Sequence, residues 1–111
     1  MTTAAPPIDS AFHALANPTR RAVVERLARG PATVSELSEP FSMALPSFLQ
    51  HLRVLEGAGL VRSEKKGRVR TVRIVPDRFQ PAAAWLERQR SMWDRRLDQL
   101  DAYVKTMGGD P

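Results

Sequence analysis

Residues 44–75 read ALPSFLQHLRVLEGAGLVRSEKKGRVRTVRIV, and the spacing of their apolar residues changes once along the segment. Up to about residue 56 the apolar residues recur every three or four positions, which is typical of a helix, and Pro46 fits only in the first turn of that helix. After Gly57-Ala58-Gly59 the pattern becomes strand-like, with Gly67 as a turn between two basic stretches. The segment therefore predicts a helix that is followed directly by a two-stranded hairpin with a basic tip.

The predicted helix has two different sides. We expect one apolar stripe to face the core, made of Leu45, Phe48, Leu49, Leu52 and Leu55. The other side carries Pro46, Ser47, Gln50, Arg53 and Val54. A Gln side chain can bond an adenine edge in a bidentate way, and Ser can bond a base or a phosphate. Arg53 is a candidate phosphate contact, and Pro46 either meets a thymine methyl or only shapes the turn. Ordinary polar surface is the alternative for each.

Positive charge is concentrated in the hairpin. The chain has 17 Lys and Arg against 12 Asp and Glu, a net charge of +5. Residues 1–50 sum to zero, whereas residues 62–73 alone carry six basic residues and one acid. We expect at least two of the cations at the hairpin tip to contact phosphate or the minor groove, the candidates being Lys65, Lys66, Arg68 and Arg70. A solvated hairpin with exposed charges is the alternative.

The residues before this segment predict three helices. Asp9 or Ser10 can cap a first helix that ends before Asn17-Pro18, and Pro18 starts a second helix that ends before Gly30-Pro31. Thr33 and Glu36 have the spacing of a capping box at the start of a third, short helix. Arg20 and Arg21 open the second helix, and either reach the DNA backbone or make salt bridges within the protomer. The third helix, a tight turn and the helix from residue 44 form a helix-turn-helix candidate, and the hairpin makes it a winged one.

The last predicted element is a long helix from about Pro81 to about Met107. Its apolar residues are spaced as in a heptad seam, with one break around Gln89-Arg90; they are Leu86, Trp93, Leu97, Leu100, Val104 and Met107. A seam at the end of a chain indicates a helix that pairs with a second copy, although a plain core helix is the alternative. The fold class is therefore mainly α with a small β-hairpin, a winged helix-turn-helix with a long C-terminal dimerisation helix.

Length and composition exclude several classes of protein. The 111 residues suffice for one domain, expected at 9–107 after a disordered arm at 1–8 and before a tail at 108–111. No residue is cysteine, which excludes disulfides, thiolate metal sites and a Cys nucleophile. The chain shows no Gly-rich phosphate loop, no G-x-S-x-G motif, no apolar run long enough for a spanning helix and no signal peptide. We expect a cytoplasmic protein that is not an enzyme, has no cofactor and does not bind membranes.

The segments quoted above, together with ALANPTRRAVVERLARG and SELSEPF, resemble the ArsR/SmtB-type winged-helix transcriptional repressors. The resemblance covers about residues 10–106, and it is closest to the branch without metal ligands that carries ALPSFLQHL and a Trp-rich last helix. It implies a homodimer that binds a pseudo-palindromic operator on double-stranded DNA, most often at its own promoter.

The resemblance also implies site residues. The helix from residue 44 would enter the major groove and the wing would contact the flanking backbone or minor groove. The first and last helices would form the dimer interface, through Phe12, Leu86, Trp93, Leu97, Leu100 and Val104. His51 occupies the family's H-L position and either contacts DNA or hydrogen-bonds within the motif. Ala44 and Leu49 are apolar where many relatives have Ser, so the operator should differ from theirs.

Metal sensing is not expected, because metal-binding relatives place Cys on the third helix or His and Asp on the last one. Here the third helix has no Cys, and the last helix has Asp94, Asp98 and Asp101 without His. Two other functions stay open: a non-specific architectural DNA binder and a winged-helix module for protein contact. The sequence does not identify an operator sequence or an inducer, and repression follows from the resemblance alone.

Overall fold

A computed structural model describes residues 6–108, and contacts divide the chain into two compact units, residues up to 81 and residues from 82 on. The single domain expected over residues 9–107 stays a prediction. Most of the predicted arm and tail lies outside the described residues. Residues 7 and 8, which we assigned to the arm, are instead helical.

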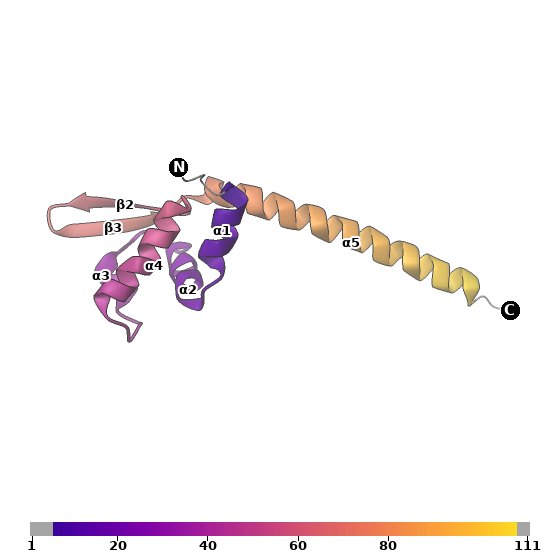
Figure 1. Cartoon of the computed structure of the whole chain (residues 1–111), viewed down its shortest axis with the longest axis horizontal. Helices are drawn as coiled ribbons and strands as arrows, with labels where there is room; N and C mark the ends of the chain where they lie inside the picture. The colour runs from indigo at the N-terminus through magenta and orange to yellow at the C-terminus, as the bar shows by residue number, and fades with distance from the viewer. Residues whose placement is uncertain (1–5, 109–111) are drawn as a thin grey trace, which may run out of the picture. The chain divides into compact units, whose positions relative to one another are not determined.

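The first two helices are α1 (Pro7–Leu15) and α2 (Pro18–Leu27), and each has a proline in its first turn (Figure 1). The expected cap of α1 at Asp9 or Ser10 is wrong, because Pro6 takes the cap position and the Pro6 carbonyl accepts from the Ser10 amide at 3.0 Å. Proline suits this place since its missing N–H would have no partner in the first turn. Asn17 caps α2, its side chain accepting from the Arg20 amide at 3.1 Å.

The helix-turn-helix consists of α3 (Val34–Ser38) and α4 (Leu45–Gly57). The capping box predicted for α3 is confirmed. Thr33 Oγ1 accepts from the Glu36 amide at 3.1 Å, and Glu36 Oε1 accepts from the Thr33 amide at 2.9 Å. Ala44 is the N-cap of α4, and Pro46 lies in its first turn, as the sequence requires.

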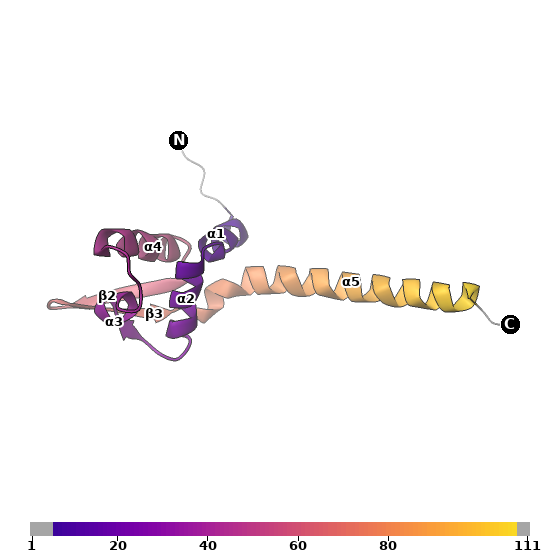
Figure 2. The same ribbon diagram turned by 90° about the horizontal axis from the view of Figure 1, so that it is seen from below.

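The hairpin consists of β2 (Val61–Lys66) and β3 (Val69–Ile74), with Gly67 at φ 61° in the turn. A third strand, β1 (Ala32–Thr33), pairs antiparallel with β3, so that the sheet order is β1-β3-β2. The sequence did not predict β1. Figures 1 and 2 show the hairpin extending beyond the helices, with its tip on the same side of the unit as α3 and the start of α4.

The core of the first unit lies between the helices and the sheet. Its largest fully buried side chains are Phe48, Leu27, Leu55, Leu60, Val23 and Val72. The apolar stripe predicted on α4 is correct for Phe48, Leu52 and Leu55, which are buried, but wrong for Leu45, which is 51% exposed. Leu45 is the first residue of α4, one turn beyond the buried part of the helix, and Leu49 is only half-buried.

A short 3₁₀ helix, η1 (Pro76–Phe79), connects the sheet to α5 (Gln80–Met107). The bounds of α5 agree with the predicted last helix to within a residue. Within residues 6–108, no helix combines the length and the apolar character that crossing a membrane requires.

Candidate nucleic-acid interface

The solvent-facing side of α4 carries the residues that we predicted for contacts with DNA bases and phosphates. Pro46, Gln50 and Arg53 are exposed and follow one another at spacings of four and three, so they share a face of the helix. Ser47 is also exposed, in the first turn. The buried Phe48, Leu52 and Leu55 hold the opposite side against the core. A helix anchored in this way can present its polar face to a major groove, which admits an α-helix.

His51 lies at the edge of that face, half-buried, and is hydrogen-bonded within the unit. Its Nδ1 lies 3.1 Å from Arg20 Nη1. A guanidinium can only donate, so Nδ1 accepts and the ring proton of a neutral imidazole is on Nε2. Of the two roles expected for His51, the structure shows the hydrogen bond within the motif. A contact of Nε2 with DNA stays a prediction.

Arg20 and Arg21 cap the end of α1 rather than forming salt bridges. Arg20 Nε donates to the Ala14 carbonyl at 2.6 Å, and Arg20 Nη2 donates to the His13 carbonyl at 3.1 Å. Arg21 Nη1 donates to the Leu15 carbonyl at 2.9 Å. These carbonyls belong to the last turn of α1, where helices leave acceptors without partners. Arg20 thus ties α1, α2 and α4 together and sets the position of α4.

The hairpin presents its cations to solvent. Lys65, Lys66, Arg68 and Arg70 are all exposed. Arg70 donates to Ser63 Oγ at 3.2 Å, whereas Lys65, Lys66 and Arg68 have no ion-pair partner within residues 6–108. Lys65 pairs directly with Arg70 across the two strands. Like charges at such a position destabilise a hairpin, and an anionic partner would relieve this repulsion.

A groove separates α4 from the hairpin. Leu49 and Arg70 border two adjoining cavities in it, of about 190 and 390 Å³. The smaller one is also lined by Arg53 and Glu56 of α4. The exposed face of α4 and the hairpin cations are therefore parts of one surface of the first unit. We call the larger cavity, with its lining residues, the α4–hairpin groove.

The second unit carries all the residues that we predicted for dimerisation except Phe12. On α5 each member of the predicted seam is more than half exposed within the chain: Leu86, Trp93, Leu97, Leu100, Val104 and Met107. Phe12 lies on α1 and is 36% exposed. An exposed apolar stripe of this length on a helix marks an interaction surface.

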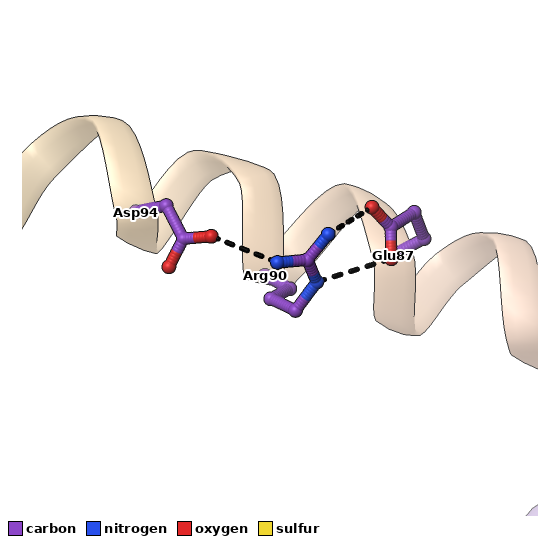
Figure 3. Close-up of polar contacts among 3 residues, drawn as sticks. All are labelled: Glu87, Arg90 and Asp94. Carbon is purple, nitrogen blue, oxygen red and sulfur yellow. Dashed lines mark hydrogen bonds and ion pairs between the residues drawn. The ribbon is translucent and has the colours of Figure 1, made fainter.

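Arg90 occupies the break in the seam. It lies between two acids of α5, with Nη2 2.6 Å from Glu87 Oε1 and Nη1 3.0 Å from Asp94 Oδ2 (Figure 3). The hydrogen bonds from Arg90 hold the pKa of the Glu87 carboxyl below its ordinary value. These pairs balance the charge of Arg90 on its own helix.

The described residues hold no group of three or more His, Asp or Glu side chains arranged to ligate a metal ion. Sequence reasoning also missed two features of the interface. One is the hydrogen bond that joins Arg20 to His51, and the other is the exposure of Leu45 beside the hairpin.

The chain is similar to known proteins over most of its length. Residues 15–64 match a family model described as a helix-turn-helix domain. The transcriptional regulator Rv2034 of Mycobacterium tuberculosis is 37% identical over 102 residues, which are 92% of this chain and 92% of that protein. The transcriptional repressor SdpR of Bacillus subtilis is 32% identical over 60 residues, which are 54% of this chain and 67% of that protein.

A crystal structure of an ArsR family transcriptional regulator superposes with a TM-score of 0.76 at 53% identity, covering 80% of this chain and 98% of that one. The similarity to it and to the Mycobacterium tuberculosis regulator extends over more than the helix-turn-helix itself.

Proposed function

This chain belongs to the ArsR family of winged helix-turn-helix transcriptional regulators, and on that premise we propose that it is a metal-independent homodimer that represses transcription from its own promoter. Proteins of this family are DNA-binding regulators and not enzymes. Repression, autoregulation, the pseudo-palindromic operator and independence from metals are all parts of this proposal.

The observation that carries the proposal is the union of two surfaces in the first unit. The exposed face of α4 offers Ser47, Gln50 and Arg53, and the adjoining hairpin offers cations without ion-pair partners within residues 6–108. Phosphate contacts position a protein on DNA, whereas contacts to base edges specify the sequence. A surface that has both kinds of side chain favours sequence-specific binding over purely electrostatic binding.

The exposed seam of α5 supports a homodimer. One winged helix contacts only a few base pairs, and two copies related by a twofold axis would read two half-sites of inverted sequence. The seam is apolar enough to pair with a second copy, with Leu97 and Leu100 near the middle of its longest uninterrupted part. We place Phe12 of α1 in the same interface.

Two observations support repression without a metal. The similar protein from Bacillus subtilis is named a transcriptional repressor. This chain has no cysteine anywhere, and its α3 reads VSELS, with no thiolate to offer a soft metal. An inducer, if one exists, would then be a small molecule or a protein.

The proposal is tested by fluorescence anisotropy in salt of about 150 mM, near the physiological ionic strength. The full chain is titrated onto labelled duplex from upstream of its own gene, with unlabelled random duplex as competitor. Specific binding should persist in a large excess of competitor, with a Kd of roughly 10⁻⁸ to 10⁻¹¹ M. Addition of a chelator should leave that affinity unchanged. In a transcription assay on the same promoter, addition of the protein should lower the amount of transcript.

The outcomes separate the parts of the proposal. Loss of binding under competitor would contradict autoregulation, and selection from a random duplex pool would then show whether the chain prefers any sequence. A pool without an enriched sequence would contradict specific binding and favour an architectural or protein-binding role. An affinity that falls with chelator would contradict metal independence.

A further inference from the structure

The first turn of α4 carries an apolar side chain at the surface, where the core gives it no cover. Leu45 is 51% exposed, and Leu49, one turn later, is half-buried. Residues four apart on a helix lie on the same side. Leu45 and Leu49 therefore form one apolar row, beside the row that holds Pro46 and Gln50.

This apolar row faces the hairpin. Leu45 and Leu49 line the α4–hairpin groove, whose volume is about 390 Å³, together with Val69 of the hairpin, which is 52% exposed. The rest of its lining comes from the α3 start and the hairpin cations: Thr33, Val34, Ser35, Lys65, Arg68 and Arg70. The groove is thus lined by apolar and cationic side chains together, and none of its lining residues is acidic.

A ligand that fits this groove must present anionic groups to the cations and an apolar group to the two leucines. Duplex DNA meets both conditions, because phosphates run along the groove edges and thymine presents a 5-methyl group in the major groove. Recognition helices contact base edges mainly with their N-terminal residues, and Leu45 is the first residue of α4.

We propose that Leu45, supported by Leu49, reads the methyl group of a thymine in each half-site, on the hairpin side of the base that Gln50 contacts. This inference rests on the proposed function, since it needs the chain to bind duplex DNA. In this inference the apolar pair contributes to the choice of DNA sequence, in addition to the hydrogen bonds expected from Ser47 and Gln50. The cations that line the groove hold the adjacent phosphates and so bring the thymine to the leucines.

The test removes a methyl group from the DNA and a side chain from the protein. The full chain first selects its preferred duplex from a random pool. In that duplex each dT is then replaced singly by dU, which lacks only the 5-methyl group, and affinities are measured for the wild type and for Leu45→Ala. Because Leu45 is exposed, this variant should fold, and its thermal unfolding temperature is measured to check this. Met92→Ala is the matched control, because Met92 is an equally exposed apolar residue (53%) outside the predicted seam of α5.

In each half-site we expect one thymine whose replacement by uracil lowers the affinity of the wild type and of Met92→Ala by about fourfold. This factor corresponds to the free energy of burying one methyl-sized apolar group. Leu45→Ala should bind the dT and dU duplexes equally. The inference is overturned if no position responds to the loss of the methyl group, or if Leu45→Ala responds as strongly as the wild type. If the groove instead binds a small apolar anion, no position in the duplex should respond to the loss of the methyl group. A pool without any enriched sequence would contradict the proposed function itself.

Discussion

Arg20 Nη1 lies 3.1 Å from Nδ1 of His51 and so connects the start of α2 to the middle of α4. The same guanidinium donates to two carbonyls in the last turn of α1. One side chain therefore satisfies acceptors on two other helices and fixes the position of the helix that we expect in the major groove. Stability and DNA affinity should both depend on this contact.

The first prediction concerns this contact. Arg20→Ala should lower the free energy of unfolding by about 1–3 kcal/mol, because it leaves partly buried acceptors without a donor. Urea denaturation measures the loss. Arg29→Ala is the control, since the side chain of Arg29, which lies just after the end of α2, is exposed and makes no hydrogen bond or ion pair within residues 6–108.

A second variant separates structure from DNA contact at His51. In His51→Asn, Oδ1 can accept from Arg20 where Nδ1 did, but nothing replaces Nε2. We expect this variant to be nearly as stable as the wild type. Its affinity for the operator should be lower by about fivefold, which corresponds to the net free energy of one hydrogen bond. Unchanged DNA affinity of His51→Asn would assign His51 a structural role only. Equal free energies of unfolding for Arg20→Ala and Arg29→Ala would contradict the role of Arg20 in joining the helices.

The second prediction concerns base recognition. Gln50→Ala should cost about 1–3 kcal/mol of binding free energy and relax specificity at a single base position. The preferred duplex of the variant, selected from a random pool, shows the position. Gln99→Ala removes the same amide from the exposed surface of α5 and serves as control. A variant that binds every duplex more weakly without changing its preference would contradict a base contact by Gln50.

The elements that follow local rules were predictable from sequence. The capping box of Thr33 and Glu36 depends on residues three positions apart, so their spacing suffices. The strand β1 was not predictable, because its two residues show no periodicity and pair with Val72 and Thr71 far along the chain.

The parts of the interface that escaped prediction depend on tertiary structure. Helical periodicity assigned Leu45 to the correct row of α4, but it does not show where the core ends along that row. The hydrogen bond between Arg20 and His51 joins residues 31 positions apart, and no spacing rule relates them. The exposed polar face of α4 and the basic hairpin could be predicted from the sequence, whereas the groove between them could not.

The third prediction concerns the hairpin. Lys66→Ala should weaken binding to all duplexes by a similar factor, because phosphates carry no sequence information. The slope of log K against log salt should become less steep by about 0.9 for each lost phosphate contact. Lys105→Ala is the control, since it removes one positive charge from α5. An unchanged slope would remove Lys66 from the DNA interface.

The fourth prediction concerns the seam on α5. Leu97→Glu should give monomers in sedimentation equilibrium, because a carboxylate would have to be buried between two helices. Operator affinity should fall by on the order of 100-fold, since the two half-sites would no longer be bound together. Gln99→Glu adds the same charge outside the seam and should remain a dimer. A dimeric Leu97→Glu would refute pairing through the seam.

The fifth prediction concerns the pH dependence of stability at the junction of β1 and α3. The Thr33 amide donates to Glu36, and this bond holds the pKa of the Glu36 carboxyl below its ordinary value of 4.5. A carboxyl whose pKa is lower in the folded state stabilises that state above its unfolded pKa. The contribution is lost as the pH falls through the lower, folded pKa.

Glu36→Gln keeps an acceptor for the Thr33 amide but has no charge to titrate. The wild type should therefore be more stable than this variant near neutral pH, and the difference should close as the pH falls below 4.5. Urea denaturation at a series of pH values measures the difference. Glu39→Gln removes the same charge outside the capping box and corrects for the change in net charge. A difference that stays constant with pH, or that equals the one for Glu39→Gln, would show that the carboxylate of Glu36 does not stabilise the start of α3.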